Sequence, residues 1–171
     1  MPSASETSAA RPARPARAFT VCGTAFIVAA AVAAAINLNQ PFPHGWWLVA
    51  YLSLVGGVAQ LILASGVVAL ARMRGARTGL SHSVPELLLW NAGTIIVALA
   101  DLMGRPVGVL VGSVMLIAAL MLFALELSGT LRRPSAAGRK AVTWAWLYGG
   151  FLVFMAASTA IGTVLAYRVP T

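Results

Sequence analysis

The stretch that decides the fold, residues 83–129, reads SVPELLLWNAGTIIVALADLMGRPVGVLVGSVMLIAALMLFALELSG. It holds two apolar segments, about 84–103 and 106–128, which are separated by little more than the short sequence MGRP. Each segment is about 20 residues long, the length at which a helix crosses a hydrocarbon core of roughly 30 Å. Proline fits the first turn of a helix, so Pro106 suits a helix that starts directly after a tight turn. We therefore predict an antiparallel pair of transmembrane helices on which the rest of the chain packs.

Three more apolar segments lie outside this pair, at about 18–36, 45–71 and 141–167. Of the 171 residues, 60% are hydrophobic and only 9% are charged, whereas about a quarter of a soluble domain is charged. The segments lack two-residue alternation, which favours helices over strands, and helices pair their own backbone groups in lipid. The sequence thus predicts an all-α integral membrane protein, a bundle of five transmembrane helices within a single domain, 18–168, embedded in a lipid bilayer.

The region before the first segment, residues 1–17, consists mainly of Ser, Ala, Pro and Arg. A composition so poor in apolar residues cannot form a core, so we predict a disordered basic tail. The charged start and following apolar run also resemble a cleavable signal peptide. The run at 18–36 is longer than the usual signal core, and we therefore favour a retained helix.

The positive charge of the chain, +8, is unevenly distributed. Ten of the twelve Lys and Arg residues lie in the tail and in the connections at 72–82 and 129–140. Because cytoplasmic connections of membrane proteins are enriched in Lys and Arg, we predict a cytoplasmic N-terminus and an external C-terminus. The topology accounts for the positive charge, so we predict no nucleic-acid partner. We predict a multi-pass protein of a cell membrane, specifically a bacterial plasma membrane.

The start of the third segment carries a helix-cap signal. Ser83 is followed three residues later by Glu86, the spacing of a capping box in which both side chains bond open N–H groups. A carboxylate also suits the positive end of the helix dipole. We interpret Ser83 and Glu86 as a cap, and a proton-binding role for Glu86 is the alternative.

Polar residues of the third segment share one side. At about 100° per residue, Asn91, Thr94 and Asp101 fall on one arc with Glu86. We expect this arc to face protein, with Gln60 of the second segment bonded to Asn91 or Thr94 as structural glue between helices. A narrow polar path for a small solute is the alternative interpretation.

Two further acidic residues need partners. Asp101 lies four residues before Arg105, so a local ion pair is predicted if the helix extends that far. Glu126 lies near Arg132 and Arg133, and it also faces the connection at 72–77. We expect Glu126 to pair with one of these basic residues, and an ion or proton site is the alternative.

Three glycines, Gly104, Gly108 and Gly112, recur at intervals of four residues. Small residues allow membrane helices to approach closely, which is how such helices associate when lipid is as apolar as their own side chains. We predict that this stripe packs against the third segment. The alternative neighbour is the fifth segment, in which the small residues Ser158, Gly162 and Ala166 also recur at intervals of four.

The two histidines are placed on opposite sides of the predicted membrane. His44 lies in the first connection and His82 in the second, about 30 Å apart. They cannot share one haem or metal ion. His44 alone, beside the interfacial residues Trp46 and Trp47, is the one residue that we would assign to a cofactor, as a haem or copper ligand or as part of a quinone site. We predict no other cofactor or metal.

The sequence contains none of the short motifs that mark phosphate, thiol, serine-hydrolase or zinc chemistry, and we do not expect an enzyme. Our first functional interpretation is a non-enzymatic membrane protein, an accessory subunit that packs against a larger membrane protein or associates with itself. A small-solute transporter or channel that uses the Gln60, Asn91 and Asp101 face is the second. A haem- or quinone-linked respiratory subunit that uses His44 is the third.

Overall fold

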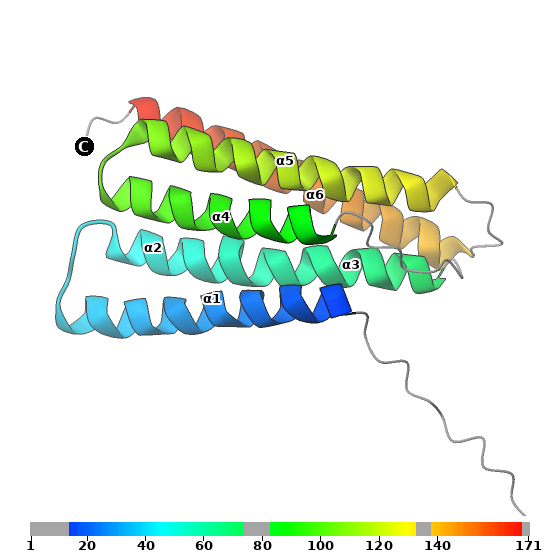
Figure 1. Ribbon diagram of the computed structural model, residues 1–171, viewed down its shortest axis with the longest axis horizontal. Helices are drawn as coiled ribbons and strands as arrows, with labels where there is room; N and C mark the ends of the chain where they lie inside the picture. Colours follow the sequence, from blue (N-terminus) through cyan, green and yellow to red (C-terminus); the bar gives the residue numbers. More distant parts are fainter. Residues whose placement is uncertain (1–13, 74–82, 133–137, 169–171) are drawn as a thin grey trace, which may run out of the picture.

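The computed structural model describes residues 14–73, 83–132 and 138–168, and within these ranges the chain is helical with no strand. In the same ranges five helices are long and apolar enough to cross a membrane, as the sequence predicts. The helices run alternately in opposite directions, so the connections alternate between the two ends of the bundle (Figure 1). We call the end with the connection between the first two helices the His44 end, and the opposite end the basic end.

The first helix, α1 (Arg14–Asn39), is longer than predicted at both ends. Its first four residues belong to the predicted disordered tail, so the predicted boundary at residue 17 was four residues too late. Pro15 lies in the first turn, where its missing N–H costs no hydrogen bond. The remaining residues of the predicted tail lie outside the described ranges.

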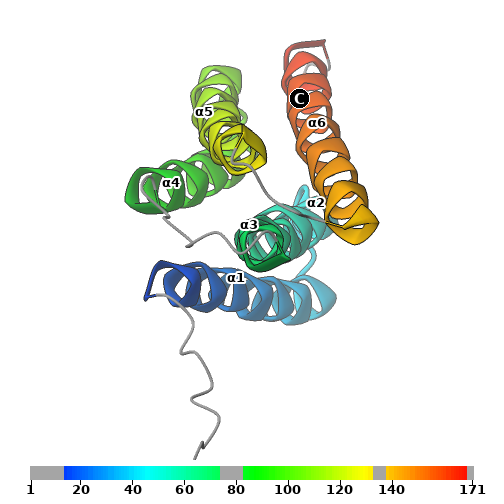
Figure 2. The same ribbon diagram turned by 90° about the vertical axis from the view of Figure 1, so that its right-hand side faces the viewer.

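The second span lies at the centre of the bundle and consists of three consecutive pieces (Figure 2). These are α2 (Gly45–Tyr51), a π-helical stretch η1 (Leu52–Ala59) and α3 (Gln60–Met73). α1 covers one side of this span, and the other helices cover the opposite side. π-Helical turns are rare and are found often at functional sites.

The third and fourth spans, α4 (Ser83–Leu102) and α5 (Pro106–Arg132), form the predicted hairpin. Gly104 closes it with φ 61°, while the Arg105 N–H donates to Ala100 O at 2.8 Å and the Gly104 N–H to Asp101 O at 3.0 Å. This pair of hydrogen bonds is a Schellman motif, which needs a residue in the left-handed region. Gly104 therefore ends α4, and its part in the packed glycine stripe stays a prediction.

Gly108 and Gly112 do lie against α4, the neighbour predicted from the sequence. A Cβ atom on Gly108 would be 2.6 Å from Ala100 Cβ, and one on Gly112 would be 2.6 Å from Val97 Cγ2 and 2.8 Å from Gly93 O. Backbones can approach this closely only without side chains between them. The alternative stripe on the last helix, α6 (Arg139–Arg168), is not used in this way, because a Cβ atom on Gly162 would meet nothing within 4 Å.

The polar arc of α4 faces the interior, as predicted. Glu86, Thr94 and Ala98 are buried, whereas the opposite side of the helix exposes large aliphatic side chains. These exposed residues are Val84, Leu88, Ile95, Leu99 and Leu102. A helix with an apolar outer side and a polar inner side is what a lipid environment favours.

α1 makes a second close contact, which the sequence analysis did not anticipate. A Cβ atom on Gly23 would lie 3.2 Å from Gly57 O in η1, and one on Gly56 would lie 2.7 Å from the Phe26 ring. Glycines on both helices thus let α1 lie directly on the π-helical stretch. α6 packs along α5 and α3 on the other side of the bundle.

Candidate functional site

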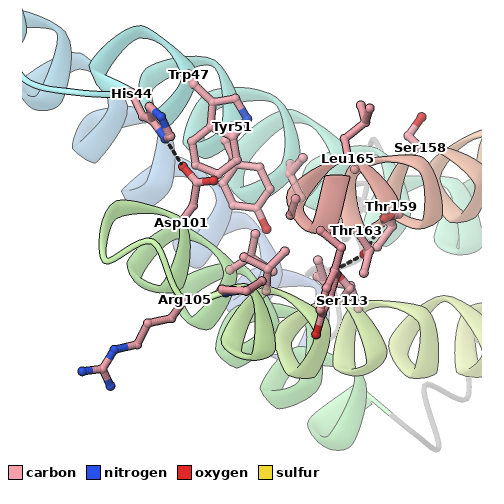
Figure 3. Close-up of a pocket in the computed structure, with 18 of the residues that line it drawn as sticks. His44, Trp47, Tyr51, Asp101, Arg105, Ser113, Ser158, Thr159, Thr163 and Leu165 are labelled. Atoms are coloured by element: carbon pink, nitrogen blue, oxygen red, sulfur yellow. Dashed lines mark hydrogen bonds and ion pairs between the residues drawn. The ribbon is translucent and has the colours of Figure 1, made fainter. Parts of the chain in front are cut away.

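A cavity of about 900 Å³ opens at the His44 end, between α2, α4, α5 and α6 (Figure 3). Its volume is in the range of pockets that hold small organic ligands. Apolar atoms form most of its surface, and polar groups occur at its mouth and along one side. The polar lining residues are His44, Tyr51, Asp101, Arg105, Ser113, Ser158, Thr159, Thr163 and Tyr167.

The first polar element is the turn that carries His44. The Gly45 N–H donates to Phe42 O at 3.1 Å, which makes Pro43 and His44 the two central residues of a turn. His44 has φ 61° and ψ 13°, a conformation that glycine usually supplies at the second central position. His44 is the one non-glycine residue with positive φ in the described ranges. Backbone conformations of this kind are concentrated at functional sites.

The turn is held in place by the end of α1. Asn37 is buried, and its Oδ1 accepts a hydrogen bond from the Phe42 N–H at 3.2 Å. A Cβ atom on Gly45 would collide with the same oxygen, so a side chain at position 45 would displace Asn37 from this hydrogen bond. The His44 carbonyl in turn accepts the Leu48 N–H at 2.8 Å and starts α2. The imidazole is therefore presented by a fixed turn.

His44 is joined to Asp101, in the last turn of α4. His44 Nδ1 lies 2.8 Å from Asp101 Oδ2, and the two side chains are 44% and 22% exposed. The predicted ion pair between Asp101 and Arg105 was wrong. α4 ends at Leu102, and the Schellman turn carries Arg105 off the helix, so that its guanidinium points away from Asp101 (Figure 3).

An aromatic wall follows the turn. The rings of Trp47 and Tyr51, four residues apart on α2, stack with centroids 4.9 Å apart and planes within 9°. The Tyr51 hydroxyl lies close to that of Thr94 on α4. In the described part of the chain neither hydroxyl makes a hydrogen bond of good geometry. Of the two residues, Tyr51 lines the cavity.

A hydroxyl pair lies across the cavity from this wall. Thr163 Oγ1 on α6 is 2.7 Å from Ser113 Oγ on α5, and it is also 2.8 Å from Thr159 O. The pair of Ser113 and Thr163 was not predicted from the sequence. The available signal was that Ser113 directly follows the packed Gly112, and that Thr159 and Thr163 recur at helical spacing on an apolar helix.

A second polar group lies in the other half of the bundle, toward the basic end. Glu86 is fully buried, and its carboxylate oxygens have no hydrogen-bond partner in the described structure. The carboxylate half of the predicted capping box is therefore not formed, because the side chain enters the bundle instead of turning back to the start of α4. Glu86 lies close enough to Glu126 to interact electrostatically, and Tyr148 lies near both.

Gln60 and Asn91 do not form the predicted bridge. Gln60 is fully buried, and its amide atoms have no hydrogen-bond partner in the described structure. The Asn91 side chain instead donates to Leu87 O of its own helix at 2.7 Å. A carbonyl one turn back is always within reach of such a side chain, and it competes with any neighbour. The bond predicted from Gln60 to Asn91 or Thr94 was wrong.

The predicted polar face is thus divided into two groups. Asp101 lines the cavity, whereas Gln60, Glu86, Thr94 and Glu126 do not. Between the two groups the core contains Trp90, whose indole N–H donates to Val55 O at 3.2 Å. Arg133 and most of the connection after α3, which were predicted partners of Glu126, lie outside the described ranges, as do His82 and the side chain of Ser83.

No protein-family model, no curated protein and no solved structure matches this chain. Among the residues that the structure describes, no three His, Cys, Asp or Glu side chains lie close enough together to hold a metal ion. His44 could supply a single ligand to a cofactor, with Asp101 behind it as the carboxylate that orients a ligating imidazole.

Proposed function

We propose that the protein is a multi-pass integral membrane protein that binds a small amphiphilic solute in the cavity at the His44 end. The observation that carries this proposal is the cavity itself, a volume of about 900 Å³ with a mostly apolar surface and polar groups from several helices. Sites for small molecules have this composition, in which the apolar wall supplies affinity and the polar groups fix orientation.

Membrane insertion rests on the five apolar helices and on the aliphatic outer side of α4. For orientation, the exposed basic residues at the ends of the spans support a cytoplasmic basic end. Arg17, Arg72, Arg132, Arg139 and Lys140 are of this kind. In this orientation the cavity faces the outer leaflet, and a solute enters it from outside or from the lipid.

The protein binds the solute without conducting it as an open channel. The residues that line the cavity deepest in the bundle include Val55, Leu116 and Met155, and beyond them the core is closed by large buried side chains such as Trp90 and Phe123. A carrier with this structure would have to change conformation in order to release the solute on the other side.

An accessory subunit is the second candidate function. It is favoured by the part of α6 near the His44 end, which packs loosely on this chain. Ile161, Val164 and Leu165 are exposed there, and a Cβ atom on Gly162 would have open space around it. In this case a helix of a larger membrane protein fills the cavity that we assign to a solute.

A comparison of two tryptophan variants tests the proposal. Ala166 lines the cavity and is half-buried, whereas Ala160 is an exposed residue of the same helix that does not line it. We expect an amphiphile to co-purify at about one molecule per chain with the wild type and with Ala160→Trp, and to be lost from Ala166→Trp, as measured by native mass spectrometry in mild detergent. Equal retention by all three proteins, or no bound molecule in any, would overturn the proposal. A membrane protein that co-purifies with the wild type and is displaced by Ala166→Trp supports the second candidate.

A further inference from the structure

We infer that the cavity recognises an aromatic ring hydroxyl, that is, a phenol or hydroquinone, and that the pair His44–Asp101 accepts its O–H. The inference rests on the proposed function and names the chemical class of the solute. It follows from the protonation pattern of the pair, from the shape of the wall beside it and from the position of the second set of hydroxyls.

The hydrogen bond between His44 and Asp101 determines which ring nitrogen keeps a lone pair for another donor. An ionised carboxylate can only accept hydrogen bonds, so Nδ1, at 2.8 Å from Asp101 Oδ2, carries the proton. In a neutral ring the lone pair is then on Nε2. An imidazole whose Nδ1–H is held by a carboxylate is a directed acceptor for an acidic O–H, the arrangement seen in general-base pairs. A phenolic hydroxyl is a suitable donor.

The pair is also held in position before a ligand arrives. His44 occupies the left-handed position of its turn, and Asn37 and Gly45 fix that turn on the end of α1. Asp101 is fixed by the last turn of α4. A preorganised acceptor loses little freedom on binding, so more of the hydrogen-bond energy appears as affinity.

The wall beside the pair suits a flat ring. Trp47 and Tyr51 present a stacked aromatic surface next to His44 (Figure 3). Aliphatic side chains such as Val97 and Val109 line the cavity as well. Aromatic rings gain both from burial of their faces and from offset or edge contacts with other rings.

The second set of hydroxyls can bind another oxygen on the ring. Ser113 follows Gly112, whose backbone touches Val97, and Val97 is four residues from Asp101. At 1.5 Å per residue, the hydroxyls of Ser113 and Thr163 therefore lie about 6 Å further along the bundle than Asp101. The Tyr51 hydroxyl is free to bond as well. A molecule with oxygens at two ends of an apolar ring matches this order of groups.

The ring can reach the cavity from the lipid. Leu165, Ala166 and Tyr167 line it on α6, the helix whose packing is loosest at this end, and Leu165 and Tyr167 are also exposed on the outside. A hydroquinone with a long alkyl tail could place its ring inside and leave its tail between the helices. A soluble phenol would offer the same hydroxyl without the tail.

Matched probes test the inference on the full-length protein in detergent. The probes are a decyl-substituted benzohydroquinone and its dimethyl ether, which has the same ring and tail but no O–H. We expect the hydroquinone to bind roughly tenfold more tightly than the ether, the effect of one strong hydrogen bond. Binding should be measured without oxygen, by thermophoresis or by competition. Equal affinities for the two probes overturn the inference.

Three variants test whether the preference for the hydroquinone over its ether depends on His44 and Asp101. Asp101→Asn and His44→Asn should reduce the ratio of the two affinities to about one, and His44→Gly provides a second test because glycine also accepts positive φ. Asn39→Ala, at an exposed residue of the same end of the bundle that does not line the cavity, should leave the ratio unchanged. A ratio that survives both His44 variants overturns the inference.

Two further comparisons distinguish a soluble phenol from a membrane quinol, and failure of this inference from failure of the proposed function. If the tail-free hydroquinone binds as tightly as the decyl form, the natural ligand is a soluble phenol, and if the tail adds affinity, it is a membrane quinol. Both results support the ring hydroxyl. If neither probe binds while another amphiphile is retained by the wild type and lost from Ala166→Trp, this inference fails and the proposed function stands.

Discussion

The contact between α4 and α5 leads to a sharp prediction about Gly112. A Cβ atom at this position would lie 2.6 Å from Val97 Cγ2, 2.8 Å from Gly93 O and 2.9 Å from Val97 N. Two of these three atoms belong to the backbone, so a rotamer change of Val97 cannot relieve the contact. Even alanine must therefore push the two helices apart.

The expected size of the effect follows from two opposing contributions. Overpacking of a close contact costs about 1–3 kcal/mol, whereas Gly→Ala in a helix gains up to about 1 kcal/mol. The substitution Gly150→Ala in α6 should show only the gain in helix propensity, because a Cβ atom there would meet nothing within 4 Å. The difference between Gly112→Ala and Gly150→Ala should thus equal the overpacking cost of about 1–3 kcal/mol. For a protein of this size that is roughly 2 to 12 °C in melting temperature.

The measurement is the melting temperature of the two variants in one detergent. Gly112→Ala should melt well below Gly150→Ala, and adding Val97→Ala to Gly112→Ala should restore only part of the loss, because the contact with Gly93 O remains. Equal melting temperatures for the two single variants would refute the packing argument, and full restoration by Val97→Ala would show that the backbones are not in contact.

Three other predictions concern buried polar groups and topology. Glu86→Leu should raise the melting temperature, because a fully buried carboxylate without a hydrogen-bond partner costs more than a well-packed apolar side chain; a decrease would contradict this. Tyr148→Phe should cost about 1 kcal/mol by deleting the 3.0 Å bond to Leu63 O, while Tyr167→Phe at an exposed site should have no effect, and equal losses would contradict the assignment. In a Cys22→Ala background, Asn39→Cys should react with an impermeant thiol reagent on intact cells and Gly138→Cys should not; the reverse pattern would invert the proposed orientation.

The features that could be predicted from the sequence depend on composition and helical periodicity. Five apolar segments, their approximate bounds and the buried side of α4 follow from segment length and a repeat of about 100° per residue. The contact of Gly108 and Gly112 with α4 follows from their spacing and from the shortness of the turn. These properties are local, and packing in three dimensions does not alter them.

The candidate site depended on long-range contacts and was only partly predicted. Asp101 was paired with Arg105 because the two are four residues apart, and the end of α4 could not be placed to one residue. The Schellman turn at Gly104 removes Arg105 and leaves Asp101 to His44, 57 residues away in sequence. Ser113 and Thr163 are likewise 50 residues apart, and no periodicity relates residues on helices that pack only in three dimensions.

The energetics of His44 give a reason to place function at this end of the bundle. A left-handed backbone costs a non-glycine residue roughly 1–2 kcal/mol, of which the greater entropy of an unfolded glycine offsets about 0.5–1 kcal/mol. The His44–Asp101 hydrogen bond is partly exposed, at a site where even a fully charged pair would contribute only about 0–1 kcal/mol. The imidazole therefore adds little or nothing to stability over a glycine at the same position. Its presence in a fixed turn at the mouth of the cavity is better explained by what the side chain binds.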